Sequence, residues 1–132
     1  MAWQSIQRNT IGEGTPFVTV GSTSRYGRAT HAQMVVNISA TLARHIGVNP
    51  GDRIELEIGT LADIGWMRIS KGKEQKATGH GHAGSIRIRF SGRRLGVTDG
   101  YTPTNVKYKT GRNGEKPYLI FMLPAWARIE RN

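Results

Sequence analysis

The stretch LARHIGVNPGDRIELEI, residues 42–58, decides the fold, because it contains the end of a short helix, a tight turn and a strand. Leu42 and Ile46 are four residues apart and share one helix face, and Gly47 stands where a left-handed cap residue is expected. The turn NPGD, residues 49–52, is typical of type II, since proline fixes φ at its second position and glycine accepts positive φ at its third. Residues 53–58 then alternate apolar and charged side chains, which predicts a half-buried strand. A two-turn helix is not stable alone, so the unit must pack against a partner.

The residues around this stretch predict the rest of a small β unit. Met34–Ile38 is a run rich in β-branched residues and predicts a buried strand, and Phe17–Val20 predicts an earlier one. Ser39 suits a helix N-cap whose hydroxyl accepts a hydrogen bond from an amide of the first turn. After a loop, Trp66–Ser70 predicts the antiparallel return strand.

A second, diverged copy of the unit follows. Residues 86–90 alternate as a strand, SGRRLGV (91–97) resembles the earlier SATLARHIGV (39–48) with three residues removed, and residues 117–123 predict a return strand. The equivalences are Leu95-Gly96-Val97 with Ile46-Gly47-Val48, Asp99-Gly100 with Pro50-Gly51, and Val106 and Tyr108 with Ile54 and Leu56. Asn113-Gly114 is a favoured hairpin dipeptide.

The first copy resembles the swapped-hairpin domain of AbrB-type transition-state regulators and MazE-type antitoxins. The resemblance rests on VVNISATLARHIGVNPGDRIELEI (35–58), with MRISKG (67–72) as the return strand and SRYGRAT (24–30) as the loop before the first strand. In that family two identical chains each supply one hairpin unit, and together they close a small barrel that binds DNA. Because this chain carries two copies, the resemblance implies a pseudo-twofold barrel within one monomer.

We therefore predict a mostly β fold with one or two short helices, forming a swapped-hairpin, AbrB-like β-barrel from an internal pseudo-repeat. The single domain, residues 1–132, divides into an N-terminal arm and strand (1–33), a first repeat (34–71), a linker (72–84), a second, basic repeat (85–123) and a C-terminal segment (124–132). The second copy lacks most of the helix and the Pro-Gly-Asp turn. The chain also ends soon after the second copy, without the acidic tail of the antitoxins, which argues against an antitoxin. Two diverged halves do not require a palindromic DNA site.

Charge is the strongest signal of function. The formal net charge is +10, and residues 85–123 contribute +6 of it, from eight basic and two acidic side chains. Residues 31–71 carry four of each sign and are neutral. A clustered basic excess is typical of nucleic-acid-binding proteins and indicates that one half faces the partner.

The candidate nucleic-acid-binding residues come from the basic half. Arginine forks suit phosphates and the guanine edge, and if the strands are neighbours these charges converge on one surface. The alternative is a solvated sheet face whose cations guard an edge strand. The candidates are Arg87, Arg89, Arg93, Arg94, Lys107, Lys109 and Arg112, with Arg25 and Arg28 in a loop that is equally compatible with an ordinary polar loop. Arg44 and Arg53 have Asp52 and Glu55 nearby and are expected to pair locally.

Metal, cofactor and enzyme functions find little support in the sequence. There is no cysteine, and His80 and His82 lack nearby carboxylates that would complete a metal site, so we expect no metal or cofactor. No phosphate-binding loop or nucleophile motif is present, and we expect no enzymatic activity.

The three tryptophans, Trp3, Trp66 and Trp126, are interpreted as packing anchors. No apolar run could span a membrane and no secretion signal is seen, so we expect a cytoplasmic, nucleoid-associated protein.

The sequence thus favours a DNA-binding protein, a transcriptional or nucleoid regulator that places a basic β face on double-stranded DNA. One alternative is a small phage or mobile-element protein that binds and inhibits a host protein. Another is an RNA or single-strand binder that stacks bases on Tyr101 and Tyr118. The expected state is a monomer with pseudo-twofold symmetry or a weak homodimer.

Overall fold

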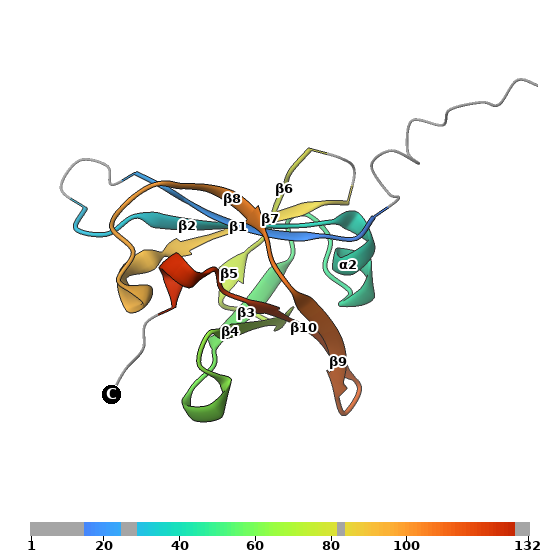
Figure 1. Cartoon of the computed structure of the whole chain (residues 1–132). Coiled ribbons are helices and arrows are strands. Elements are labelled where there is room, and N and C mark those ends of the chain that lie inside the picture. Colours follow the sequence, from blue (N-terminus) through green and yellow to red (C-terminus); the bar gives the residue numbers. More distant parts are fainter. Residues whose placement is uncertain (1–14, 25–28, 82–83, 129–132) are drawn as a thin grey trace, which may run out of the picture.

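The computed structural model describes residues 15–24, 29–81 and 84–128 and contains two five-stranded antiparallel sheets (Figure 1). Sheet A has, in spatial order, β6 (Thr78–Gly79), β7 (Ile86–Ser91), β2 (Gln33–Ile38), β1 (Val18–Thr23) and β8 (Tyr101–Asn105). Sheet B has β5 (Gln75–Lys76), β3 (Arg53–Ile58), β4 (Trp66–Lys71), β10 (Lys116–Met122) and β9 (Tyr108–Asn113). The helical elements are α2 (Ala40–His45) and the 3-10 turns η1 (Leu61–Asp63), η2 (Gly92–Leu95) and η3 (Ala125–Ala127). The prediction of a mostly β fold with short helices is confirmed.

One hydrophobic core joins the two sheets. Strand β3 shows how the sequence builds it, because Ile54 is buried and Leu56 and Ile58 pack against the core, whereas Arg53 and Glu57 are exposed. The same alternation buries Val18 and Val20 of β1, Ile86 and Ile88 of β7, and Leu119 and Phe121 of β10. Period-2 alternation therefore predicted the inward faces of β3 and β7.

The turn after α2 has the predicted geometry. Gly47 has φ of 72° and Gly51 has φ of 95°, both in the left-handed region. The Asp52 amide donates to the Asn49 carbonyl (2.9 Å), which closes the turn, and the Asn49 amide donates to Asp52 Oδ2 (2.9 Å). The glycines stand where the conformation requires them.

Ser39 precedes α2 as its N-cap residue, but its side chain does not cap the helix. Its hydroxyl instead accepts a hydrogen bond from the Phe17 amide (3.1 Å), and its own amide donates to the Phe17 carbonyl (3.0 Å). The prediction of a capping hydroxyl was wrong because the amide of Phe17, the residue before β1, supplies a competing donor. Ser91 before η2 does act as a cap, since its Oγ accepts from the Arg93 amide (3.2 Å).

The segment 72–84, expected to be a linker without secondary structure, contributes two short strands. In β5, Arg53 pairs with Lys76, and in β6, Thr78 pairs with Arg87. Ala77 between them is fully buried and exchanges backbone hydrogen bonds with Gly51 and Asp52. The segment connects the two copies, but it also pairs with both sheets. The sequence did not predict these two strands, because pairing at a sheet edge uses backbone groups and needs no apolar periodicity.

The second copy differs from the first in its long strand. The sequence predicted one strand around Val106 and Tyr108, whereas the structure has β8 in sheet A and β9 in sheet B, separated by two residues. Gly100 is not among the glycines with positive φ, so Asp99-Gly100 does not reproduce the Pro50-Gly51 turn. Gly114 and Glu115 form the turn between β9 and β10, one residue later than the Asn113-Gly114 dipeptide predicted.

Candidate functional site

Strand β7 holds Arg87 and Arg89 on the outward face of sheet A, opposite Asn37 and Val35 of β2. Arg87 is half-buried, and its Nε donates to Asn37 Oδ1 (2.8 Å). Asn37 Nδ2 in turn donates to Thr19 Oγ1 (3.2 Å) on β1. Arg87 is therefore part of a polar chain across three strands, whereas Arg89 is exposed.

His80 extends this polar chain beyond β6. Its Nε2 lies 3.0 Å from Arg87 Nη2. Burial lowers the pKa of His80, and the positive charges of Arg87 and Arg89 lower it further. Burial also lowers the pKa of Arg87, with a further contribution from Arg89. The neutral imidazole is thus favoured, and in that form Nε2 can accept a hydrogen bond from the Arg87 guanidinium.

The turn η2 presents Arg93 and Arg94, and both are exposed. In Figure 1 this turn lies at the left end of sheet A and α2 lies at the right end. The opposite placement follows from the antiparallel pairing of β2 and β7, whose carboxyl ends lead into α2 and η2 respectively. The described ends of the loop that contains Arg25 and Arg28 leave β1 and β2 on the same side as η2, because Thr23 pairs with Gln33 and Gln33 pairs with Ser91. Arg25 and Arg28 themselves lie outside the described residues.

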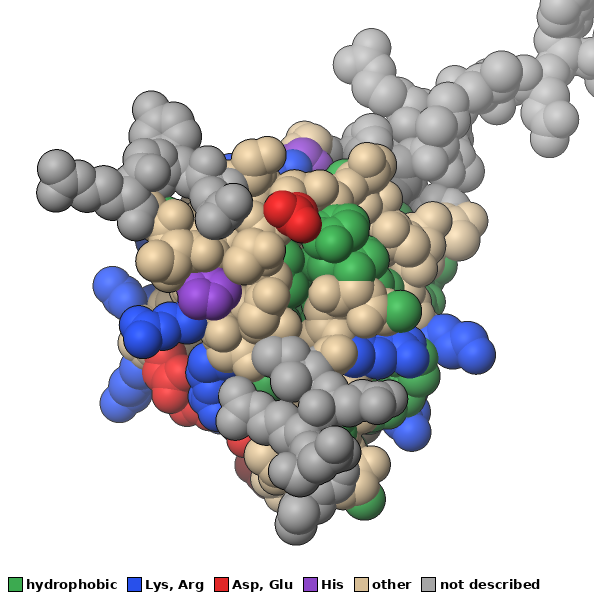
Figure 2. All heavy atoms as spheres, turned by 60° about the vertical axis from the view of Figure 1, so that its left-hand side comes forward, with side chains coloured by type: hydrophobic (Ala, Val, Ile, Leu, Met, Phe, Trp, Pro, Cys, Tyr) green, Lys and Arg blue, Asp and Glu red, His purple; other side chains and the backbone are tan. Residues whose placement is uncertain are grey.

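The remaining candidates lie on or beside β9 in sheet B. Lys109 Nζ stands 5.3 Å from the centroid of the Trp66 ring, Arg112 donates to the Glu115 carbonyl (3.2 Å), and Lys107 is exposed between β8 and β9. Strands β7 and β9 are in different sheets. The prediction that all these charges converge on one surface of neighbouring strands was therefore wrong, because the chain crosses between the sheets after β8. Figure 2 shows Lys and Arg side chains at two flanks of the view, separated by polar and apolar surface.

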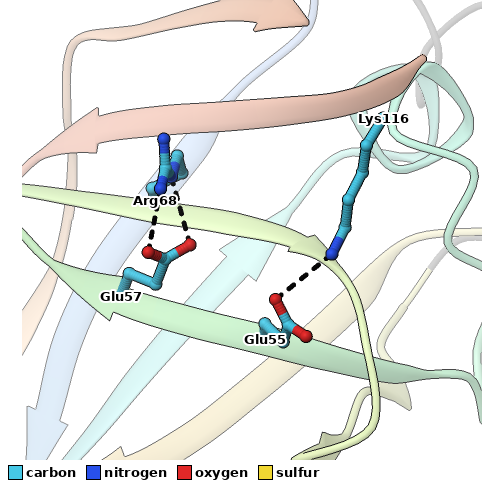
Figure 3. Close-up of polar contacts among 4 residues, drawn as sticks. All are labelled: Glu55, Glu57, Arg68 and Lys116. Atoms are coloured by element: carbon cyan, nitrogen blue, oxygen red, sulfur yellow. Dashed lines mark hydrogen bonds and ion pairs between the residues drawn. The ribbon is translucent and has the colours of Figure 1, made fainter. Parts of the chain in front are cut away.

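The glutamates of strand β3 contact cations on β4 and on β10, the strand beyond it in sheet B (Figure 3). Arg68 forms a two-bond contact with Glu57 (2.8 and 3.2 Å), and Lys116 contacts Glu55 (3.2 Å). The hydrogen bond from Arg68 lowers the pKa of Glu57. The two copies therefore do not form separate neutral and basic faces, since their hairpins share one sheet. The local pairing expected for Arg44 and Arg53 with Asp52 or Glu55 is not found among the described residues, where Glu55 pairs with Lys116 and Asp52 forms a long pair with Lys71 (3.9 Å).

Most candidate cations have no carboxylate of the described residues within ion-pair distance. Among residues 15–24, 29–81 and 84–128, the ion pairs are those of Arg68, Lys71 and Lys116. The exposed candidates without such a pair in this part of the chain are Arg89, Arg93, Arg94, Lys107, Lys109 and Arg112. Their charge is available to an external anion.

Aromatic side chains are engaged with other groups of the protein. Trp126 stacks on Tyr101 with centroids 4.2 Å apart and planes at 9°. The guanidinium of Arg68 lies 5.5 Å from the centroid of the Tyr118 ring. Trp66 and Trp126 are half-buried and pack as predicted for anchors, and Trp3 lies outside the described residues. Sequence reasoning missed the cation contacts of Trp66 and Tyr118, which depend on cross-strand neighbours.

Within the described part of the chain, no group of three His, Cys, Asp or Glu side chains could hold a metal ion. His82, the partner of His80 in the sequence, is outside it. No helix among the described residues has the length and apolar character needed to cross a membrane. No family model matches the chain, and no curated protein or solved structure is significantly similar to it.

Proposed function

We propose that this protein binds double-stranded DNA through exposed cations of its second repeat and acts as a transcriptional or nucleoid regulator. The observation that carries the proposal is the set of six exposed cations that have no carboxylate partner among the described residues. Together with a net charge of +10, they favour a polyanionic partner.

The strand pairing supports a swapped-hairpin barrel. Equivalent strands of the two copies pair with each other, β2 with β7 and β4 with β10. The strand before each copy also pairs with the other copy or its flank, since β1 pairs with β8 and β5 pairs with β3. The chain crosses between edge strands of the two sheets twice, from β5 of sheet B to β6 of sheet A and from β8 of sheet A to β9 of sheet B. This reciprocal exchange supports the proposal of a pseudo-twofold arrangement, which the resemblance to AbrB-type regulators implies.

The η2 end of sheet A is the surface that we assign to DNA. Arg93 and Arg94 are adjacent and exposed there, and exposed Arg89 is on the strand that leads into this turn. The loop with Arg25 and Arg28 leaves the sheet at the same end, as the register of β1, β2 and β7 shows. Lys109 and Arg112 lie on β9 of sheet B and Lys107 lies just before this strand. These three residues form a secondary cluster that supplies additional phosphate contacts.

A gel-shift series at several salt concentrations tests this proposal with random duplex DNA, single-stranded DNA and RNA in parallel. If about five phosphates are neutralised, the log–log salt slope on duplex should be near −4 to −5. Arg93→Ala with Arg94→Ala should weaken binding and flatten the slope by up to about two units. The fold should survive, because exposed charges contribute little to stability.

The matched control is Arg44→Ala with Arg53→Ala, which removes the same charge from exposed positions of the first copy. It should change duplex affinity much less than the η2 pair. Equal losses from both pairs would show diffuse attraction rather than a site at η2. Preference for single strands would favour the RNA or single-strand alternative. If none of the three nucleic acids binds, the alternative function that stands is inhibition of a host protein.

A further inference from the structure

A pocket lies beside η2, between the loop after β3 and the C-terminal turn η3, with a volume of about 290 Å³. In Figure 1 the three segments are the green turn at the bottom, the gold turn at the left and the red turn above the C-terminal end. The floor is aliphatic and comes from Ile58, Leu95, Leu123 and Ala127. Its size is at the lower end of the range for small-molecule sites, roughly 300–1,000 Å³.

The walls of this pocket are fixed by backbone hydrogen bonds between distant segments. The Leu123 amide donates to the Gly65 carbonyl (2.7 Å), and the Gly59 amide donates to the Trp66 carbonyl (2.8 Å). Ile64 lines the pocket with 45% of its surface exposed, which is unusual for a large aliphatic side chain. Apolar surface is thus held open to solvent by a rigid frame.

The charged side chains that line the pocket are the cations Arg94 and Arg128, and Thr60 adds a neutral hydroxyl. None of the described residues that line it is acidic. Arg128 Nε donates to the Leu123 carbonyl (2.7 Å), which holds its guanidinium near the pocket wall. Guanidinium groups form strong, often bidentate hydrogen bonds with carboxylates. An apolar floor beside two guanidinium groups matches a ligand with an aliphatic body and an anionic head.

We propose that this pocket binds a small aliphatic carboxylate, and that its occupancy weakens DNA binding. The aliphatic chain lies on Ile58, Ile64 and Leu95, and the carboxylate lies between Arg94 and Arg128. The regulatory part rests on the proposed function, because Arg94 is one of the two η2 arginines assigned to DNA. A carboxylate paired with Arg94 removes a phosphate contact, so ligand and DNA compete for this side chain.

Octanoate, used below its micelle concentration, tests the pocket by NMR titration of the full chain without DNA. Shifts should concentrate at Ile58, Ile64 and Leu95. Octanoate should bind at least tenfold more tightly than butyrate, because each covered methylene contributes about fourfold. It should also bind more tightly than octanol, which lacks the charge. Absence of saturable binding, or binding with no preference for octanoate over octanol, overturns the proposal.

Two neighbouring substitutions separate a specific contact from general attraction. Arg94→Gln should reduce octanoate affinity severalfold and leave octanol binding unchanged. Arg93→Gln removes the same charge one residue away at a position that does not line the pocket, and should leave octanoate affinity unchanged. Equal effects of both variants overturn the site. A chain shortened to residue 128 serves as a further control, and octanoate binding only to that form would show that residues 129–132 are the occupant instead.

The competition is measured separately, by gel shift of duplex DNA with and without saturating octanoate. Weaker binding of the unmodified protein, with no octanoate effect on Arg94→Gln, supports the regulatory link. If octanoate binds and DNA affinity is unchanged, the proposed competition is overturned, whereas the proposed carboxylate site stands. Failure of the unmodified protein to bind DNA refutes the proposed function, and the direct titration then decides the pocket alone.

Discussion

Helix α2 and the shorter 3-10 turn η2 lie at opposite ends of sheet A. Each follows a strand of the sheet and ends in a glycine cap. After α2, the Gly47 amide donates to the Arg44 carbonyl (3.0 Å) and the Val48 amide donates to the Ala43 carbonyl (2.9 Å). After η2, the Gly96 amide donates to the Arg93 carbonyl (3.1 Å) and the Val97 amide donates to the Gly92 carbonyl (3.0 Å). Both sets have the spacing of a Schellman motif.

The apolar residues around the two caps are also equivalent. Ile46 and Val48 are 1% exposed, and Leu95 and Val97 are 5% and 2% exposed. The cap glycines have φ of 72° and 66°. The shorter turn η2 therefore has the same cap and apolar anchors as α2, whereas α2 also buries Leu42 and Ala43 in the core. What differs is the surface, where η2 presents adjacent arginines beside a pocket.

The largest expected effect comes from separating the two copies. A fragment of residues 1–72 should not fold as a monomer, because β2 loses β7 and β4 loses β10, and the core between the sheets is opened. Circular dichroism melts and size-exclusion chromatography would show an unfolded or self-associated fragment. A monomeric fragment that melts cooperatively would contradict the expectation that each copy needs the other, since one copy would then fold alone.

Substitution of the cap glycines should show whether the two turns are energetically equivalent. Gly47→Ala and Gly96→Ala should each destabilise the protein by about 1 kcal/mol, because a Cβ is strained at positive φ. The two losses should agree within about 0.5 kcal/mol when free energies of unfolding are measured in urea. Gly79→Ala is the control, since Gly79 lacks positive φ and an added Cβ would meet Pro50 only at ordinary contact distance, 3.5 Å. A much smaller loss at Gly96 would mean that the short turn is not held by its cap.

The polar chain that links His80 to Arg87 of the second copy and Asn37 of the first predicts a pH effect. The folded-state pKa of His80 is lowered from its ordinary value of 6.5, so the unfolded state binds the proton more readily. This contribution to stability is complete above about pH 6.5 and is lost as the pH falls through the lowered value. The measurement is denaturant unfolding across that range, where His80→Gln should weaken the pH dependence.

The two neighbouring arginines provide the control for this effect. Arg87→Gln should raise the pKa of His80 more than Arg89→Gln, because Arg87 contributes the larger charge effect. Proton NMR titration of the imidazole measures both. An unchanged pKa in Arg87→Gln would show that the contact between Arg87 and His80 does not form in solution.

The smallest effect is expected for the acidic strand of the first copy. Glu55→Ala with Glu57→Ala should change the free energy of unfolding by less than about 1 kcal/mol, since both ion pairs are solvent-exposed. Duplex affinity should be unchanged or higher, because Arg68 and Lys116 are released. Loss of binding in this variant would place the functional face on sheet B and favour a protein partner.

The sequence by itself determined the local features of this protein. Gly47 and Gly51 have the predicted positive φ, and Ile54, Ile86 and Ile88 lie in the core as their alternation indicates. These features depend on steric limits of one residue or on a period of two, so they are encoded within a few positions. The equivalence of Leu95-Gly96-Val97 with Ile46-Gly47-Val48 was visible for the same reason.

Only the tertiary structure decided how these pieces are assembled. The pairing of residues 75–79 with both sheets, the division of the second long strand into β8 and β9, and the Glu55–Lys116 contact join segments far apart in the chain. Strand pairing is made by backbone groups that every residue carries, so side-chain patterns do not name the partner. The charged candidates were therefore found by composition, whereas their separation into an η2 cluster and a β9 cluster followed from the point at which the chain changes sheets.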